Sequence, residues 1–367
     1  MAHVLRILGT RGVPAIHGGF ETFAERLSIQ LVQCGWRVIV YCQEEGIGKE
    51  ILDTWQGVER VRIPVVGSGA WGSIKFDWKS IAHAAQHRDL CLTLGYNTAI
   101  FCSVLRIKGI PNIINMDGIE WSRSKWGPVA KVWLWLNERA ACRLGNHLIA
   151  DHPAIKEHLS LHVCPSKITT IAYGADLLAD LPETRVRALG LEPGRYMTLI
   201  ARPEPENSVL EVVEGFSRRS RGISLAVLGK YDDSTAFHRA VKAAAGPEVV
   251  FLGPIYEKSV IQALRFHCQA YVHGHQVGGT NPSLIEALGA GNAVIAHDNR
   301  FNRGVAGDNA TYFKDADSLD QALRSLDVTN DLKKMAEASI EIFRENYTWS
   351  IIFENYERLL RKYIEVG

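Results

Sequence analysis

Short apolar runs alternate with amphipathic stretches along this chain, and this alternation constrains the fold more than any other feature. A run over 4–8, a glycine-bearing loop over 9–19, a helical pattern over 20–32 and a second run over 37–41 form a predicted βαβ unit. Further predicted strands of this half lie at 61–64, 90–94, 112–115, 147–150 and 168–171. Such alternation is typical of a parallel, doubly wound sheet.

The alternation stops at 181–195, where glycine, proline and charged residues cluster, and then starts again. The second set of predicted strands lies at 196–201, 223–229, 249–253, 270–275 and 293–297. At 367 residues the chain is also too long for one ordinary core. The sequence therefore predicts an α/β fold of two Rossmann-like domains, 1–176 and 177–345, whose strand ends face a cleft, and a terminal helix over 346–367 that docks on a domain surface.

Charge and cysteine content exclude several classes of function. Lys and Arg number 41 against 40 Asp and Glu, so the chain lacks the overall positive charge of a nucleic-acid-binding protein. Seven scattered cysteines without C-x-x-C spacing fit neither a disulfide framework nor a zinc site. No run approaches the roughly 18 apolar residues of a membrane span. We therefore expect a cytoplasmic protein that touches membrane only peripherally if at all, and then at the inner face of the cell membrane.

Paired glycines, Gly18 and Gly19, stand at the start of the first predicted helix. Their backbone amides and the positive end of the helix could hold a diphosphate, and a tight strand-to-helix turn is the alternative. After Gly9 and Gly12 the next glycine is Gly18, so the spacing departs from G-x-G-x-x-G and disfavours dinucleotide binding.

A second glycine pair, Gly278 and Gly279, follows a predicted strand and precedes a helix that Thr280 or Asn281 can cap. Glu286 lies about one turn into that helix. Its carboxylate could bind both ribose hydroxyls, while the amides of Gly279, Thr280 and Asn281 bind phosphate oxygens. An exposed glutamate on a capped helix is the alternative.

Arg202 occupies the corresponding strand-to-helix turn at the start of the second domain. Its guanidinium is a candidate clamp for a diphosphate, and a surface salt bridge with Glu204 or Glu206 is the alternative. Two other patterns have spacings seen in metal sites but are interpreted in other ways. Asp315 and Asp317 precede a helical pattern and are interpreted as capping residues. His275, two residues after His273, is expected to hydrogen-bond near phosphates.

With these motifs in place, the chain resembles the retaining glycosyltransferases of family four, which have the GT-B fold. The resemblance covers nearly the whole chain and rests on the loop at Gly18, the stretch ITTIAYGAD, the turn at 202–208, the segment VGGTNPSLIEA and the terminal helix. HGHQVGGTNP and MDGIEWSRSKW are most similar to bacterial rhamnosyltransferases of polysaccharide assembly. The resemblance implies a nucleoside-diphosphate sugar donor such as dTDP-rhamnose, no metal or cofactor, and a saccharide or polyprenyl-diphosphate-linked acceptor.

Three positions depart from the family pattern. Gly278 stands where the family has a first glutamate, so only Glu286 is carried over, as ribose ligand. Asn207 stands where the family has a lysine beside its arginine, and Lys230 is the candidate to compensate. Asp117 stands nearest to the family's sugar-contacting histidine and is a candidate catalytic residue; a turn carboxylate before Gly118 is the alternative.

An aromatic and basic surface is predicted on the helix over 128–144. The stripe that is interpreted as its core face comprises Val129, Val132, Trp133, Leu136 and Ala140. Trp135 lies off that stripe, with Lys131 and Arg139 one turn to either side, and Trp121, Arg123 and Lys125 lie upstream. These six residues are predicted to contact acceptor or membrane, and an ordinary solvated face is the alternative.

Together these features predict an enzyme that transfers a sugar, rhamnose by resemblance, from a nucleoside diphosphate to a growing saccharide. A catalytically silent sugar-nucleotide-binding protein and a sugar-nucleotide epimerase are the alternatives.

Overall fold

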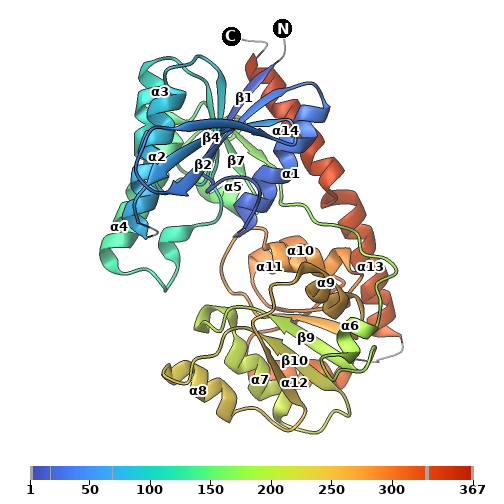
Figure 1. Cartoon of the computed structure of the whole chain (residues 1–367). Helices are drawn as coiled ribbons and strands as arrows, with labels where there is room; N and C mark the ends of the chain where they lie inside the picture. The colour runs from blue at the N-terminus through green and yellow to red at the C-terminus, as the bar shows by residue number, and fades with distance from the viewer. Residues whose placement is uncertain (1–2, 17, 68, 327–329, 365–367) are drawn as a thin grey trace. The chain divides into compact units, whose positions relative to one another are not determined.

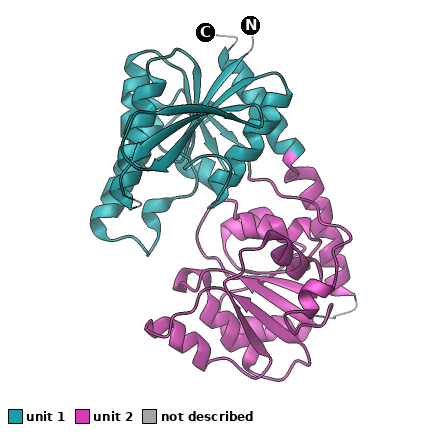
Figure 2. Cartoon of the chain, in the orientation of Figure 1, with its two compact units in different colours: residues 1–172, 350–367 teal, residues 173–349 magenta. Residues whose placement is uncertain are grey.

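The computed structural model describes residues 3–16, 18–67, 69–326 and 330–364, and the chain divides into two compact units (Figures 1 and 2). Unit 1 comprises residues 1–172 and 350–367, and unit 2 comprises residues 173–349. The sequence prediction places these boundaries after 176 and 345 instead.

Unit 1 is built on an eight-stranded sheet with the order β3-β4-β2-β1-β5-β6-β7-β8. Its strands are β1 (Val4–Leu8), β2 (Arg37–Glu45), β3 (Ile51–Trp55), β4 (Val58–Val65), β5 (Leu90–Leu94), β6 (Asn112–Asn115), β7 (His147–Ala150) and β8 (Ile168–Thr170). Neighbouring strands pair in parallel except β3 and β4, which form an antiparallel hairpin. Gln56 and Gly57 form the two-residue turn, and both have positive φ, as a tight hairpin requires.

Helices cover the sheet of unit 1, and the end of the chain supplies one of them. The chain order is α1 (Gly19–Gln33), α2 (Ala70–Ala84), η1 (Ala99–Cys102), α3 (Ser103–Ile107), η2 (Glu120–Ser122), α4 (Pro128–Leu144), α5 (Pro153–Ser160), η3 (Pro165–Lys167) and finally α14 (Trp349–Ile364). The ring of Tyr356 in α14 packs 4.8 Å from that of Phe23 in α1. The Tyr356 hydroxyl also accepts a hydrogen bond from the side chain of Asn115 in β6, at 2.7 Å. Apolar and polar contacts thus hold α14 on unit 1.

Unit 2 contains a six-stranded parallel sheet with the order β11-β10-β9-β12-β13-β14. Its strands are β9 (Tyr196–Ile200), β10 (Ser224–Leu228), β11 (Val249–Gly253), β12 (Ala270–His273), β13 (Val294–His297) and β14 (Thr311–Phe313). Its helices are α6 (Thr184–Arg187), η4 (Pro205–Asn207), α7 (Val209–Ser217), α8 (Ala236–Ala243), α9 (Lys258–Phe266), α10 (Pro282–Gly289), α11 (Arg300–Ala306), α12 (Ala316–Ser325) and α13 (Asp331–Asn346). The predicted doubly wound parallel sheets are therefore confirmed in both units.

The orientation of α4 differs from the sequence prediction. Its buried side consists of Leu134, Asn137, Glu138, Ala141 and Cys142. The predicted core stripe instead faces solvent, and Val129 is its most exposed member. The prediction was wrong because the buried side includes two polar residues, and each of them finds hydrogen-bond partners on other segments.

Candidate functional site

The sheet of unit 2 reverses its strand order beside β9, since β10 lies on one side of it and β12 on the other. In open α/β sheets, ligands bind at the carboxyl ends of the strands at such a switch point. The loops after β9, β10 and β12 carry Arg202, Lys230 and His275, and all three line one pocket of about 600 Å³. That volume is within the range of small-molecule sites. The pocket is the candidate donor site.

Two glycines let the loops around this pocket approach one another. A Cβ atom on Gly274 would lie 2.1 Å from the carbonyl oxygen of Asn207, and one on Gly229 would lie 2.8 Å from that of Ala201. Both distances are shorter than real Cβ contacts, and Gly229 also has a φ of +150°. Any other residue would push these loops apart and widen the pocket.

Arg202 projects from the turn between β9 and η4, and most of its side chain is exposed. Its guanidinium lies 3.9 Å from the Glu204 carboxylate, so the surface ion pair is present but long. Asn207 is buried, and its side-chain amide donates a 2.8 Å hydrogen bond to the Arg202 carbonyl. Asn207 therefore holds the Arg202 turn. It is not among the residues that line the pocket, and direct contact between Asn207 and the donor stays a prediction.

Glu286 is held by a residue that the sequence analysis missed. Arg265, at the end of α9, has only 5% of its side chain exposed and contacts the Glu286 carboxylate at 2.7 Å. The same guanidinium donates to the Ser283 hydroxyl at 2.9 Å, and Ser283 lines the pocket. Glu286 keeps 43% of its side chain exposed, so it can accept further hydrogen bonds from a ligand. No sequence pattern links α9 to α10, which is why Arg265 escaped notice.

The glycine segment before α10 has the predicted capping geometry. Asn281 is the N-cap residue, and its side chain accepts a 3.0 Å hydrogen bond from the Ser283 amide. Thr280, the other candidate cap, is buried. Gly278 has a φ of +138°, which favours glycine. Backbone amides of Gly279 and its neighbours at this helix end remain the predicted phosphate contacts.

His275 stacks on the ring of the buried His273. The rings of His273 and His275 stack at 4.5 Å with an interplanar angle of 13°. His273 is fully buried, and burial holds its pKa well below the usual range, so its ring is neutral. Stacked rings cannot direct their in-plane nitrogens at one metal ion. The arrangement favours the prediction that His275 serves the pocket as a hydrogen-bonding group.

In unit 1, the first glycine loop lies beside two carboxylates. Gly18 is the N-cap residue of α1 and has a φ of +80°, and Gly19 is the first helical residue. The amide of Ala15 donates to Glu25 at 2.6 Å, and that of Ile16 donates to Glu21 at 3.2 Å. Negative charge at this loop disfavours a diphosphate and favours the alternative of a tight turn.

Asp117 follows β6 with a φ of +51°, and its amide donates to the Asn115 side chain at 2.9 Å. Burial and the nearby Glu120 carboxylate raise the pKa of Asp117 to about 6. The group can therefore accept or donate a proton near neutral pH. Arg123 and Lys125, both predicted to contact acceptor or membrane, pair with Glu120 at 3.0 and 3.4 Å.

Trp121 anchors the same loop. Its indole N–H donates to the buried Glu138 carboxylate at 2.9 Å. Arg139 also contacts Glu138, and the Nε2 atom of His158 lies 3.1 Å from it. Glu138, His158 and His162 lie close enough together to hold a metal ion. The Glu138 carboxylate, however, already has three hydrogen-bond partners: the Trp121 indole, the Arg139 guanidinium and the His158 ring. The indole N–H of Trp121 is thus held by the fold, and its predicted contact with acceptor or membrane stays a prediction.

The other predicted contacts lie on α4. Trp135 is partly exposed, and the Arg139 guanidinium lies 5.1 Å from its ring centre. This cation–π contact and the Glu138 pair hold Arg139 to the helix. Lys131 is half-buried.

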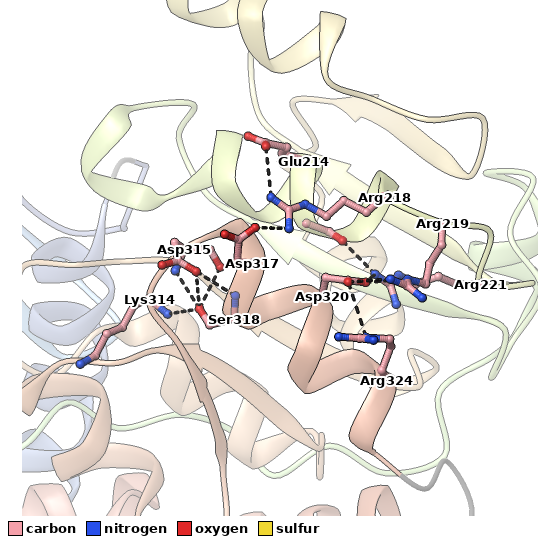
Figure 3. Close-up of polar contacts among 11 residues, drawn as sticks. Glu214, Arg218, Arg219, Arg221, Lys314, Asp315, Asp317, Ser318, Asp320 and Arg324 are labelled. Atoms are coloured by element: carbon pink, nitrogen blue, oxygen red, sulfur yellow. Dashed lines mark hydrogen bonds and ion pairs between the residues drawn. The ribbon is translucent and has the colours of Figure 1, made fainter.

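Of the two acidic residues at the start of α12 that were predicted to cap it, only Asp315 is the N-cap residue (Figure 3). Asp315 accepts from the Ser318 amide at 2.8 Å and completes a capping box. Asp317 pairs with Arg218. Deeper in the helix, Asp320 receives hydrogen bonds from two arginines of the loop after α7, Arg219 and Arg221. These contacts fasten α12 to α7.

Comparison with known proteins identifies the fold. Residues 1–176 match the family described as "Domain of unknown function (DUF1972)", and no curated protein matches the chain. Sucrose-phosphate synthase from Thermosynechococcus elongatus is similar over 100% of both chains, at 15% identity and a TM-score of 0.79. Anabaena HepE in complex with UDP and glucose is similar over 99% of this chain and 100% of its own, at 13% identity and a TM-score of 0.75.

A UDP-forming trehalose-phosphate synthase from Burkholderia xenovorans is also similar, at 11% identity and a TM-score of 0.72, over 98% of this chain and 99% of its own. The chain therefore has the GT-B fold that the resemblance implies. Within the described ranges, no helix is both long and apolar enough to cross a membrane.

Proposed function

We propose that the protein is a retaining glycosyltransferase that uses a nucleoside-diphosphate sugar as donor. The pocket of unit 2 carries this proposal, because Arg202 and Lys230 line it at the switch point of the sheet. The Arg265 guanidinium contacts both pocket-lining Ser283 and Glu286, which supports a role for the Glu286 carboxylate in binding the donor ribose. The similar HepE structure contains UDP and glucose, which is consistent with a nucleotide site in a protein of this fold.

The proposed reaction needs no protein nucleophile. The bond between the sugar C1 and the diphosphate oxygen breaks, and a bond from C1 to the acceptor oxygen forms on the same face. The acceptor proton moves to an oxygen of the departing diphosphate. Arg202 and Lys230 would stabilise the negative charge that develops there. Asp117 would position an acceptor or sugar hydroxyl.

The proposal also names a donor sugar and a class of acceptor. The resemblance of HGHQVGGTNP and MDGIEWSRSKW to rhamnosyltransferases favours dTDP-rhamnose as donor. A saccharide or polyprenyl-diphosphate-linked acceptor in polysaccharide assembly follows from the same resemblance. Neither a cofactor nor nucleic acid is part of the proposed reaction.

A panel of UDP, GDP and dTDP sugars tests the donor assignment through thermal stabilisation of the full chain. We expect one nucleotide class to raise the melting temperature, and Lys230→Ala to reduce that rise. Lys242→Ala is the matched control, since Lys242 pairs with Asp233 on the surface of the same unit. If no nucleotide stabilises the protein, the proposal fails.

Product analysis then separates the alternatives. A transferase forms glycosylated acceptor, whereas an epimerase converts the donor without any acceptor. A silent binding protein is stabilised by the nucleotide but forms neither product.

A further inference from the structure

The outer side of α4 presents apolar residues to solvent. Val129, Val132 and Leu136 are 85%, 59% and 49% exposed. Their spacing of three, four and seven residues places them on one side of the helix. The opposite side of α4 carries the buried residues. Contiguous exposed apolar surface of this kind marks an interaction site.

The apolar surface continues from α4 across η1 to α2. The Trp133 indole donates to the Asn97 carbonyl at 2.8 Å, and the Ile100 amide donates to the Asn137 side chain, so the η1 segment lies against α4. The ring of Phe101 in η1 contacts that of Trp78 in α2 at 5.4 Å. Figure 1 shows α2 and α4 on the same side of unit 1.

On α2, Trp71 and Trp78 are seven residues apart and therefore share one side of the helix, at 77% and 46% exposure. Lys75 lies between them, one turn from each, and is exposed. We name the whole surface the tryptophan face; it comprises Trp71, Trp78, Ile100, Val132, Trp133 and Leu136.

The segments that form this face carry an unbalanced charge. Residues 70–84, 97–108 and 119–145 contain nine Lys and Arg residues but only three Asp and Glu residues. In these segments, all of which the structure describes, none of the three carboxylates is exposed. Asp77 accepts from the Thr98 hydroxyl, Glu120 from Arg123, and Glu138 from Trp121. Arg123, Lys125 and Arg139 pair with Glu120 or Glu138, and the nine cations against three carboxylates leave these segments an excess of six positive charges beside the exposed indoles.

We propose that the tryptophan face binds an anionic lipid surface, with α2 and α4 lying along the headgroups. Indole rings favour the membrane–water interface, and Lys and Arg beside them are attracted to anionic headgroups. A second copy docked through the same face would bring like charges together, which disfavours self-association.

Vesicle binding by the full chain tests this proposal without any reference to catalysis. We expect sedimentation with vesicles of equal parts phosphatidylcholine and phosphatidylglycerol, and much weaker sedimentation with phosphatidylcholine alone. A Trp71→Ser, Val132→Ser, Leu136→Ser variant should lose roughly 100-fold in partitioning, because three apolar side chains leave the interface.

The matched control is Ile47→Ser, Ile51→Ser, Leu52→Ser, which removes exposed apolar side chains from the region of β3 in the same unit. It should bind vesicles as the unchanged protein does. Equal binding to both kinds of vesicle, or unchanged binding by the test variant, overturns the proposal. So does a dimer that only the test variant dissociates, since the face would then join two copies.

A charge variant keeps the proposal testable if the triple variant does not fold. Lys75→Glu alters one exposed side chain between the two tryptophans of α2 and should weaken binding to the anionic vesicles. Unchanged binding by this variant at low salt contradicts the proposed role of charge.

Discussion

The contact between Arg265 and Glu286 makes one substitution affect both folding and ligand binding. In Glu286→Ala, the buried Arg265 guanidinium loses its carboxylate partner and keeps only the Ser283 hydroxyl among the contacts described above. Breaking a fully buried ion pair costs about 3–5 kcal/mol. Because 43% of the Glu286 side chain is exposed, water can enter and compensate in part. We therefore expect a loss of about 1–3 kcal/mol in the free energy of unfolding.

The effect on nucleotide binding is separate and has its own cause. If Glu286 accepts hydrogen bonds from two ribose hydroxyls, its removal leaves both poorly paired, which weakens binding by about 1–3 kcal/mol. Glu286→Gln keeps one oxygen, which can accept from Arg265 or from a ribose hydroxyl, and replaces the other with an NH2 group that only donates. This variant should lose less than the alanine variant in both measurements.

Thermal denaturation and calorimetric titration with the preferred nucleotide measure the two effects. Glu183→Ala is the control, since Glu183 pairs with Arg187 on the surface of unit 2 and should change stability little. Unchanged nucleotide affinity in Glu286→Ala would refute the ribose assignment. Unchanged stability would refute the structural role of the Arg265 contact.

Four further predictions concern charge. Arg202→Ala should lower kcat more than it weakens donor binding, as steady-state kinetics can show, and a rise in KM alone contradicts a role in stabilising the leaving group. The pKa of Asp117 is raised to about 6 in the fold, so ionisation of Asp117 lowers stability as pH rises from about 4 to 6. Asp117→Asn should therefore be more stable than the unchanged protein at pH 8, by up to about 3 kcal/mol in urea denaturation, and no more stable at pH 4. Burial raises the pKa of Asp320, but hydrogen bonds from Arg221 and Arg219 outweigh this and lower it overall, so Asp320→Asn should destabilise the fold at pH 7 and progressively less as pH falls below about 4. Transfer activity should persist in chelator, and loss of activity that magnesium or manganese restores would contradict the proposed metal-independent clamp.

The sequence alone determined where most of the strands lie along the chain. The predicted bounds of β1, β5, β6, β7 and β11 are those of the structure. Buried parallel strands are short apolar runs between glycines and polar turns, so both their position and their type are visible in the sequence. β3 was missed because it lies at the sheet edge, where Ile51 and Leu52 are exposed.

Candidate donor residues at strand ends were also predictable. Arg202 directly follows one predicted strand and His275 is the last residue of another, and parallel strands present their carboxyl ends at one edge of the sheet. Chain connectivity alone therefore predicts that such residues come together, and both line the same pocket.

Only the tertiary structure decided which polar groups are paired. Arg265 meets Glu286 from another helix, and Glu138 meets Trp121 and His158 from two other segments. These partners made Glu138 a buried residue and turned the more apolar side of α4 to solvent. Hydrophobic periodicity shows which side chains gain from leaving water, but a polar side chain can be buried wherever distant segments satisfy its hydrogen bonds. That condition depends on contacts across the fold, which no local pattern records.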